Sequence, residues 1–511
     1  MTAAVTHLWR LLKWGRTLAR HGALTGIERD PLTPPNVRRL VRVARFGLTM
    51  PTTPDYASAL QAIGPAAIKL GQALATRPDL VGEGAAINLL RLQDSLPPAP
   101  YAAIRSAVEQ ALGAPLESIY SRFDEVPVGA ASIAQVHRAV TIEGRDVAVK
   151  VLRPGIEDEF ARALETYEWA AAHVELLGGE AERLRPRLVI AHFKQWTRRE
   201  LDLQREAASA SELKDNMVAE PNFYVPEIDW TRTARRVLTL EWLDGIKLSN
   251  RAELIAAGHD PRALAATLVR AFLRQAVVDG YFHADLHQGN LFALADGRLA
   301  AIDFGIMGRI DRRARLWLAE ILYGLITANY RRVAEIHFEA QYGPSHFNID
   351  EFATALRAVG EPIRGLPVKQ ISVARMLDGL FAITRDFEMQ TQPHLLLLQK
   401  TMVMEEGVAT ALDPDINMWE AAEPFLKDWL RTELGPEAYY ADRIVDTVRA
   451  LKLIPDLIRR IDAAYPPAGA APPSPPLADI VMIERKQWLA PLAIALISGA
   501  TAALATWLMV G

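Results

Sequence analysis

The stretch FHADLHQGNLFALADGRLAAIDFG, residues 282–305, decides the fold of this 511-residue chain. Asp285 stands five positions before Asn290, and Asp303 follows that asparagine by 13 positions. The apolar runs on either side of Asp296-Gly297 are typical of two short strands joined by a tight turn. The pattern therefore predicts that two acids and one amide are carried around a single β-hairpin.

That order and spacing match the catalytic loop of protein kinases, H-R-D-L-x-x-x-N, followed by a metal-binding D-F-G. The corresponding residues here are His283-Ala284-Asp285-Leu286 with Asn290, and Asp303-Phe304-Gly305. Phosphoryl transfer needs hard oxygen ligands for Mg²⁺, which Asn290 and Asp303 would supply. Asp285 would orient or deprotonate the attacking hydroxyl group or water. Either motif alone is weak, but both in this order indicate transfer from Mg-ATP.

A lysine suited to the α- and β-phosphates of ATP lies upstream, in Val147-Ala148-Val149-Lys150. This segment belongs to a β-branched run, 145–151, and a second strand is expected at 237–242. Helical periodicity returns after about Ser249. The sequence predicts an α+β chain with a small β-containing lobe followed by a larger helical lobe. On its own, Lys150 would read as a solvated strand end.

A second interpretation of the catalytic loop is a zinc site, because His283 and His287 are four residues apart with an acid between them. The zinc motif needs that acid directly after the first histidine, and it needs a helix. Here Asp285 is two residues after His283, and Gly289 follows the pair closely. We expect His283 to support the catalytic loop through its backbone rather than to bind metal.

Composition sets limits on the chemistry. Half of the residues are apolar, 23% are charged and there is no cysteine. This excludes a disulfide scaffold, a cysteine-ligated zinc or iron–sulfur site and a thiol nucleophile. The length predicts about three folded units.

Charge is concentrated at the N-terminus: residues 1–50 carry a net charge of +7, against −11 for the rest. No acid occurs before Glu28, and the basic residues fall opposite leucines on a helical wheel. A mitochondrial presequence would be rich in serine, which residues 1–27 lack. The acidic remainder argues against nucleic-acid binding. We predict a basic amphipathic helix lying on an anionic membrane surface.

The C-terminus predicts a membrane anchor. Residues 488–510 contain no charge, and 23 residues of helix are long enough to cross a bilayer. The alternative is a buried terminal helix of a soluble domain, which would have to be apolar on every face. Arg485 and Lys486 precede the span, so the positive-inside rule predicts that the body of the protein lies in the cytoplasm. A small-residue row within the span, at Ala495, Gly499 and Ala503, could pair two such helices in a homodimer.

Three further blocks carry a family resemblance: Lys69-Leu70-Gly71-Gln72 within residues 64–79, AASIAQVH at 130–137, and Glu200-Leu201-Asp202. With the kinase-like motifs, they resemble the UbiB (AarF/ADCK) family of atypical kinases, which is linked to ubiquinone biosynthesis. The match runs from about Gly64 to Phe304. The K-x-G-Q block is absent from ordinary protein kinases.

The resemblance implies roles for residues that spacing alone does not select. Lys69 would pair with Glu200, and Glu206 with Lys150, so that Lys69 and Glu200 join Asp285 and Lys150 as catalytic candidates. Asn290 and Asp303 remain the metal ligands. The residues expected to bind ATP are Val128, Gly129, Ala130, Ala131 and Ser132 of an alanine-rich loop, Lys150, Glu206, and the hinge residues Glu241 and Leu243.

The resemblance also implies an atypical kinase-like two-lobe fold. The expected parts are a basic amphipathic segment (1–50), a helical K-x-G-Q extension (51–118), a kinase-like N-lobe (119–246), a helical C-lobe with the catalytic loop (247–465), a juxtamembrane linker containing six prolines (466–486) and a transmembrane helix (487–511). Residues 311–465 hold no motif beyond a helical lobe.

Three functions remain open at this point. The first is a membrane-anchored, Mg-ATP-dependent kinase or ATPase that acts on or extracts lipid-like quinone precursors, alone or with ubiquinone-biosynthesis enzymes. The second is a small-molecule phosphotransferase of the aminoglycoside or choline kinase type. The third is a nucleotide-binding pseudokinase scaffold. A protein substrate is poorly supported, because no A-P-E motif or long activation loop follows Gly305.

Overall fold

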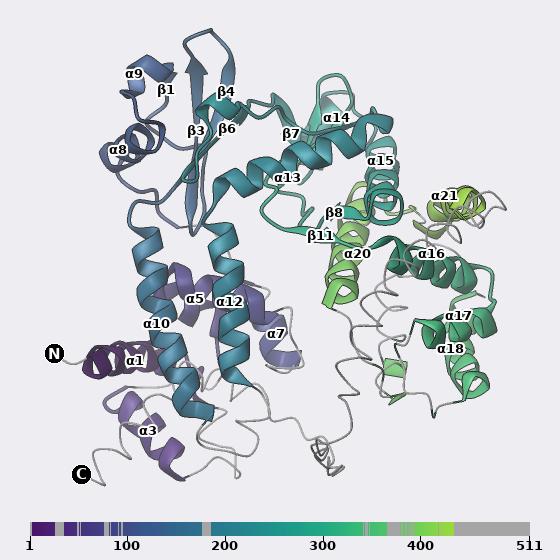
Figure 1. Cartoon of the computed structure of the whole chain (residues 1–511), viewed down its shortest axis with the longest axis horizontal. Helices are drawn as coiled ribbons and strands as arrows, with labels where there is room; N and C mark the ends of the chain where they lie inside the picture. The colour runs from purple at the N-terminus through teal and green to yellow at the C-terminus, as the bar shows by residue number, and fades with distance from the viewer. Residues whose placement is uncertain are drawn as a thin grey trace, which may run out of the picture. The chain divides into compact units, whose positions relative to one another are not determined.

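The computed structural model divides the chain into two compact units (Figure 1). Among the described residues, unit 1 comprises 3–211 and 226–242, and unit 2 comprises 212–225 and 243–433. The structure describes residues 3–433 apart from 26–34, 49–50, 52, 76–80, 82, 90, 93–95, 176–184, 341, 343–345, 347, 365–378, 380–381, 384–385, 388, 390–392 and 417.

Along the chain of unit 1, helices come both before and after the strands. Its elements are α1 (Ala3–Arg20), α3 (Pro35–Arg45), α4 (Tyr56–Ile63), α5 (Pro65–Ala75), α7 (Glu83–Leu89), α8 (Tyr101–Leu112), α9 (Leu116–Ile119), β1 (Tyr120–Phe123), β2 (Gly129–Ala130), β3 (Ala134–Thr141), β4 (Asp146–Leu152), α10 (Ile156–Glu175), α12 (Pro186–Glu200), the short 3₁₀ helix η2 (Trp230–Arg232) and β6 (Val237–Glu241). Helix α13 (Leu203–Asn216) begins in unit 1 and ends in unit 2.

The described strands of unit 1 form one antiparallel sheet in the order β1-β3-β4-β6, with β2 paired to β3. Successive side chains of a strand point to opposite faces. Val147, Val149 and Val151 of β4 accordingly pack in a core with α8 and α9. Ala148 and Leu152 belong to a different core, which α1, α5, α10 and α12 build. Lys150 shares this second face by position. The strands predicted at 145–151 and 237–242 are thus confirmed as β4 and β6.

The helical side of unit 1 joins the N-terminal segment to the K-x-G-Q extension. Helices α10 and α12 lie side by side, and α10 also contacts α1 and α5 (Figure 1). Asp55 caps α4 by accepting a hydrogen bond from the Ser58 backbone N–H, and Pro65 opens α5 in the first turn, where proline is favoured. One apolar core runs through all these helices, so the extension is part of unit 1 rather than a separate domain.

Helix α1 is amphipathic as predicted, and part of its apolar face packs inside unit 1. Leu11 and Leu18 are almost completely buried, and Trp14 packs against Tyr167 of α10. Arg10 donates to the carbonyl oxygen of Arg162, also in α10. The sequence shows that the helix has an apolar face but not what packs against that face. In the structure, other residues of unit 1 pack against Leu11, Trp14 and Leu18. Leu12 and Trp9 of the same helix stay exposed, and contact of α1 with a bilayer remains a prediction.

Unit 2 is mainly helical. Its elements are η1 (Met217–Ala219), β5 (Phe223–Tyr224), β7 (Gly245–Lys247), α14 (Arg251–Ala256), α15 (Pro261–Leu273), a π-helical turn η3 (Arg274–Asp279), β8 (Tyr281–His283), β9 (Leu291–Leu294), β10 (Leu299–Ala301), β11 (Met307–Arg309), α16 (Arg312–Ile326), α17 (Tyr330–Glu339), α18 (Ile349–Arg364), α20 (Pro393–Leu412) and α21 (Met418–Glu433).

The hairpin predicted at 296–297 is present. Strands β9 and β10 pair antiparallel, Gly297 turns with a φ of 86°, and β5 and β7 flank the pair in the order β5-β10-β9-β7. Strands β8 and β11 form a second small pair. Helices α15 and α20 pack together, and α20 also contacts β11. These strand pairs carry the segments on either side of the predicted catalytic loop.

Several predictions fall outside the described residues: the proline-rich linker, the basic pair at 485–486, the span at 487–511 and its small-residue row, and residues 76–79 of the K-x-G-Q block. Among the helices that the structure describes, none combines the length and the apolar character needed to cross a bilayer.

Helix α20 carries a fully buried carboxyl group, Glu405. Within the described part of the chain, neither of its oxygens has a hydrogen-bond partner. Burial raises the pKa of Glu405 well above its ordinary value, because a charged carboxylate loses its hydration there. The folded protein therefore keeps Glu405 protonated at a pH where the unfolded chain releases that proton.

We expect Glu405→Gln to raise the free energy of unfolding by an amount that grows between about pH 5 and pH 8. Wild type loses stability as pH rises above the unfolded pKa, by at most about 1.4 kcal/mol per pH unit, because folding must take up a proton. Glutamine does not titrate. Urea denaturation at several pH values measures the difference, with Glu406→Gln on the same helix as the control. A gain that is equal at every pH would contradict a protonated Glu405.

Candidate active site

Lys150 and Glu206 form a close ion pair in unit 1. The Lys150 Nζ lies 2.7 Å from Glu206 Oε1 and 3.0 Å from Oε2, and the two side chains are 14% and 7% exposed. Strand β4 holds the lysine between Val136 of β3 and Leu238 of β6. The first turn of α13 holds the glutamate. The pairing that the family resemblance implied is present, and it fixes the direction of the ammonium group.

A second buried ion pair joins the K-x-G-Q helix to the E-x-D segment. Lys69 of α5 lies 3.3 Å from Glu200 Oε1 at the end of α12, with the side chains 9% and 7% exposed. The Lys69 ammonium group also lies 5.9 Å from the centre of the Trp196 ring, within the range of a cation–π contact. Lysine and glutamate are rarely this buried unless they are paired. Lys69 is therefore an internal residue and not the solvated face of a helix.

Gly71 explains why this helix can lie so close to its neighbours. A Cβ at this position would stand 2.5 Å from a methyl carbon of Leu60 and 2.5 Å from one of Leu92. A side chain larger than hydrogen would force both leucines to move. Gln72, the last residue of the K-x-G-Q motif, is partly exposed.

The alanine-rich loop is held by its own strand pair. The Val128 N–H donates to the Val136 carbonyl oxygen and the Ala131 N–H to that of Ala134, both at 2.8 Å. These two amides are occupied, unlike the amides of a glycine-rich loop that cradles phosphate. Ser132 is fully buried, whereas Val128 and Gly129 are exposed.

Arg153, just beyond β4, ties this loop to the extension. Its Nε donates to the Ala131 carbonyl oxygen at 2.8 Å, and its terminal nitrogens donate to the carbonyl oxygens of Pro97 and Leu96 at 2.9 and 3.2 Å. One guanidinium group thus spans three backbone carbonyls. The arginine lies outside every motif in the sequence, and only its place after β4 could have drawn notice to it.

The residues expected at the hinge follow β6. The Glu241 N–H donates to the Glu227 carbonyl oxygen at 2.8 Å, and its carboxylate accepts from the Glu227 N–H at 3.1 Å. Leu243 is partly buried and is the first residue of unit 2 after β6. The structure shows where these two residues lie, and their part in binding adenine remains a prediction.

In unit 2, the catalytic loop is shaped by backbone hydrogen bonds around Asp285. The Asp285 N–H donates to His283 Nδ1 at 3.1 Å, and the His283 N–H donates to Gln275 Oε1 at 3.0 Å. Burial lowers the pKa of His283, so its ring stays neutral and Nδ1 remains an acceptor. His283 supports the loop as predicted. Gln275, from the π-helical turn, is a supporting residue that the sequence did not reveal.

Asn290 and Asp303 are joined through the hairpin. The Asn290 side-chain amide donates to the Asp285 carbonyl oxygen at 3.1 Å, and the Ile302 N–H donates to the Asn290 carbonyl oxygen at 2.9 Å. Asp303 has a φ of 64°, a strained conformation that is enriched at functional sites. Its side chain is exposed.

This donor set fits Mg²⁺. Because the amide nitrogen of Asn290 is occupied, its Oδ1 is the end left for a cation, and Asp303 offers an exposed carboxylate. Mg²⁺ in phosphotransferases takes one or two such protein oxygens and completes its shell with phosphate oxygens and water. The residues present are of the right type and number to hold the ion.

The zinc interpretation of His283 and His287 was wrong. His283 ends strand β8, and His287 lies in the loop that follows, so the two are not on one helix. The Nδ1 atoms of both rings accept backbone N–H groups, from Asp285 and Gly289 respectively. Each ring instead shapes the loop backbone.

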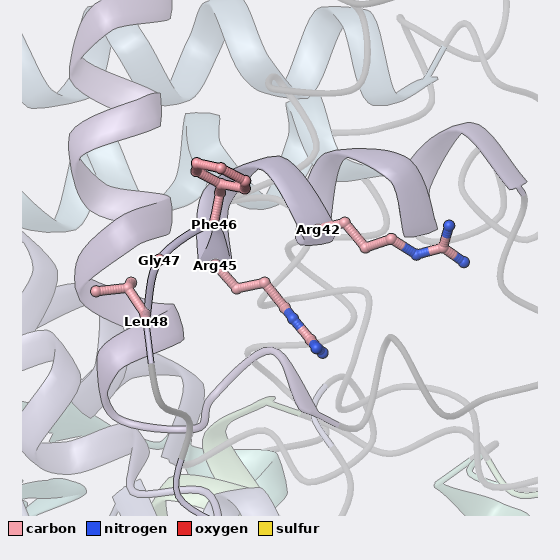
Figure 2. A pocket seen from close by; sticks show the side chains of 5 residues that line it. All are labelled: Arg42, Arg45, Phe46, Gly47 and Leu48. Atoms are coloured by element: carbon pink, nitrogen blue, oxygen red, sulfur yellow. The ribbon is translucent and has the colours of Figure 1, made fainter.

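A pocket elsewhere in unit 1 contains none of the predicted site residues. It is lined by Arg42, Arg45, Phe46, Gly47 and Leu48 at the C-terminal end of α3 (Figure 2). Phe46 is 82% exposed and its neighbour Val43 is 58% exposed, which is unusual for side chains of this kind. The two arginines extend outward from the same end of the helix (Figure 2).

Comparisons with known proteins identify the family of the chain. The profile of the ABC1 atypical kinase-like domain matches residues 91–337, and that of the UbiB helical domain matches residues 356–417. The chain is 41% identical over 382 residues to the probable protein kinase UbiB of Marinobacter nauticus, covering 74% of this chain and 70% of that protein. It is also 41% identical over 384 residues to the protein of the same name from Xylella fastidiosa strain M12, with the same coverage.

Among solved structures, the complex of Rv3197 with erythromycin from Mycobacterium tuberculosis is similar at 24% identity and a TM-score of 0.49, covering 64% of this chain and 83% of that one. Two family profiles and 41% identity over most of the chain carry the assignment without it. The fold is kinase-like, with mixed sheet and helix and a helical majority. The chain belongs to the UbiB family of ABC1-type atypical kinases.

Proposed function

We propose that this chain is a Mg-ATP-dependent atypical kinase or ATPase that supports ubiquinone biosynthesis by acting on, or extracting, lipid-like quinone precursors. The observation that carries the proposal is the complete set of polar groups for phosphoryl transfer, each held by its own partners. Lys150 is oriented by Glu206, and Asn290 is oriented by the backbone of Asp285. A scaffold without turnover would not need every member of this set.

Each residue has a distinct part in the proposed reaction. Lys150 would hold the α- and β-phosphates, and Glu206 would keep its ammonium group aimed. A bound Mg²⁺ would neutralise charge on the β- and γ-phosphates, with Asn290 and Asp303 as its protein ligands. Asp285 would accept the proton of the attacking hydroxyl or water as the new bond to phosphorus forms and ADP leaves.

The segment after Gly305 supports a small or lipid-like acceptor rather than a protein. Strand β11 occupies 307–309 and pairs with β8, and α16 begins at Arg312. Protein kinases place a long activation loop here, which forms part of the platform for peptide substrates. Six residues, 306–311, are too few to build that platform.

The exposed residues at the end of α3 support contact with an anionic membrane. Phe46 is exposed and lines the same pocket as Arg42 and Arg45 (Figure 2), and Val43 of α3 is exposed as well. Aromatic and cationic side chains together suit the boundary between lipid headgroups and acyl chains. We place the chain at the cytoplasmic face of a bacterial inner membrane, with the uncharged segment 487–511 as its main anchor.

We expect Asp303→Asn to lower Mg-dependent ATP hydrolysis by at least about 100-fold, because the metal loses its anionic ligand. The assay uses full-length protein in liposomes with Mg-ATP, with and without phenolic quinone-precursor analogues, and separates released phosphate from phosphate on lipid, small molecule or protein. Asp296→Asn, on the turn of the same hairpin, is the matched control. Undiminished hydrolysis by Asp303→Asn would refute the site assignment. Absent hydrolysis in wild type would favour the scaffold, and transfer to a soluble hydroxyl compound would favour the phosphotransferase alternative.

The Lys69–Glu200 pair gives a second prediction. Lys69→Met should lower the free energy of unfolding by about 3 kcal/mol, because it leaves the Glu200 charge buried without its partner. Adding Glu200→Gln should restore part of that loss. Urea denaturation of both single variants and the double variant measures the coupling, and Lys13→Met on exposed α1 surface is the control. Strictly additive losses would show that the two groups do not depend on each other.

A third prediction concerns the membrane. Deleting residues 488–511 should release most of the protein from vesicles at high salt, with some binding retained at low salt. In that shortened chain, Arg42→Ala with Phe46→Ser should abolish the retained binding to anionic vesicles. Val126→Ser removes an apolar residue that is 79% exposed elsewhere in unit 1 and should have no effect. Full vesicle binding of the deletion variant at high salt would show that segment 487–511 is not the anchor.

A further inference from the structure

Lys400, on helix α20, lies within ion-pair distance of the catalytic-loop carboxylate. Its Nζ is 3.9 Å from Asp285 Oδ1, and the side chains are 31% and 30% exposed. The distance is that of an ion pair rather than of a hydrogen bond. Both residues belong to unit 2, and α20 lies within residues 356–417, the part that matches the UbiB helical domain. A second family domain thus contacts the catalytic loop of the first.

The packing of α20 fixes where Lys400 can point. The buried side of the helix runs through Leu398, Met402, Glu405, Ala409 and Leu412, at helical spacing. At about 100° per residue, Lys400 leaves the helix on the side away from this stripe. It lies on the solvent-facing side of α20 and still reaches Asp285. An acceptor hydroxyl or water would approach from solvent as well.

The C-terminal end of α20 is tied to the rest of unit 2. Arg251 donates to the Leu412 carbonyl oxygen at 3.1 Å, and Arg262 lies 3.6 Å from Asp413. These contacts, and not only the Lys400 pair, therefore fix how α20 is rotated about its axis and where it lies along that axis. The backbone of α20 thus holds Lys400 at a defined position next to Asp285.

The catalytic loop has no strong cation of its own near Asp285. From His283 to Gly297 the sequence contains no lysine or arginine. Arg298 is the next basic residue, and its Nε lies 2.6 Å from Asp296 on the hairpin turn. Asp285 must hold one orientation to accept a proton from a group attacking the γ-phosphate. Lys400 supplies the charge that the loop lacks.

We infer that Lys400 is a positioning residue for the reaction, which the helical domain contributes to hold the Asp285 carboxylate in its working orientation. The inference rests on the proposed function, in which Asp285 receives the proton of the acceptor. It gives the helical domain, which carries no motif of its own, a defined role in phosphoryl transfer.

The test uses the full-length protein in anionic liposomes with Mg-ATP. Lys400→Met should lower kcat about tenfold with the KM for ATP unchanged, because Asp285 acts in the chemical step and not in nucleotide binding. Lys400→Arg keeps the charge and should restore most of the rate. In an Asp285→Asn background, Lys400→Met should cause no further loss. Lys427→Met, an exposed lysine of α21, is the control.

A second measurement separates this inference from the proposed function. Amide hydrogen exchange of the peptide covering residues 283–290 should be faster in Lys400→Met and normal in Lys400→Arg and Lys427→Met. If wild type hydrolyses ATP and Lys400→Met keeps the full kcat, the inference is wrong. If wild type shows no turnover, the proposed function fails, and unchanged exchange in Lys400→Met would then overturn the inference too. Faster exchange restored by arginine would support the positioning contact alone.

Discussion

The ion pair between Lys150 and Glu206 is the contact on which the organisation of unit 1 depends. A buried charge pair is costly unless its geometry is close and fixed, and here both carboxylate oxygens lie within 3.0 Å of the ammonium nitrogen. That requires β4 to keep its register, since a shift of one residue would turn Lys150 to the opposite face. It also requires α13 to start where it does, and the Leu203 N–H holds that start by donating to the Arg235 carbonyl oxygen.

The second pair follows from the same arrangement. Glu200 ends α12 and Glu206 lies in the first turn of α13, so consecutive helices each present one carboxylate to one lysine. Lys69 receives the first and Lys150 the second. Gly71, two residues after Lys69, lets α5 pack closely against Leu60 and Leu92. The K-x-G-Q extension and the kinase-like sheet are in this way bound into one folded unit.

Local features of the sequence were enough to predict strands β4 and β6 and the β9–β10 hairpin, because strand alternation and turn residues act over a few positions. Asp285, Asn290 and Asp303 could be named as site candidates from their order and spacing, and Lys150 only in combination with them. Glu206 could not, since many acids lie between residues 157 and 206 and only a tertiary contact distinguishes one of them. Contacts between segments remote in sequence likewise decide what packs against α1, which carbonyl groups Arg153 binds, and that Lys400 lies near Asp285. The resemblance to a family supplied two of these pairings, Lys69 with Glu200 and Lys150 with Glu206, but neither Arg153 nor Lys400.

Arg153 has a mechanical consequence. Its guanidinium group holds the carbonyl oxygens of Leu96 and Pro97 in the extension and that of Ala131 in the alanine-rich loop. The guanidinium group is rigid and planar. We therefore expect a displacement of residues 96–97 to be transmitted through it to the alanine-rich loop. A ligand that displaces the extension is expected to displace the loop as well.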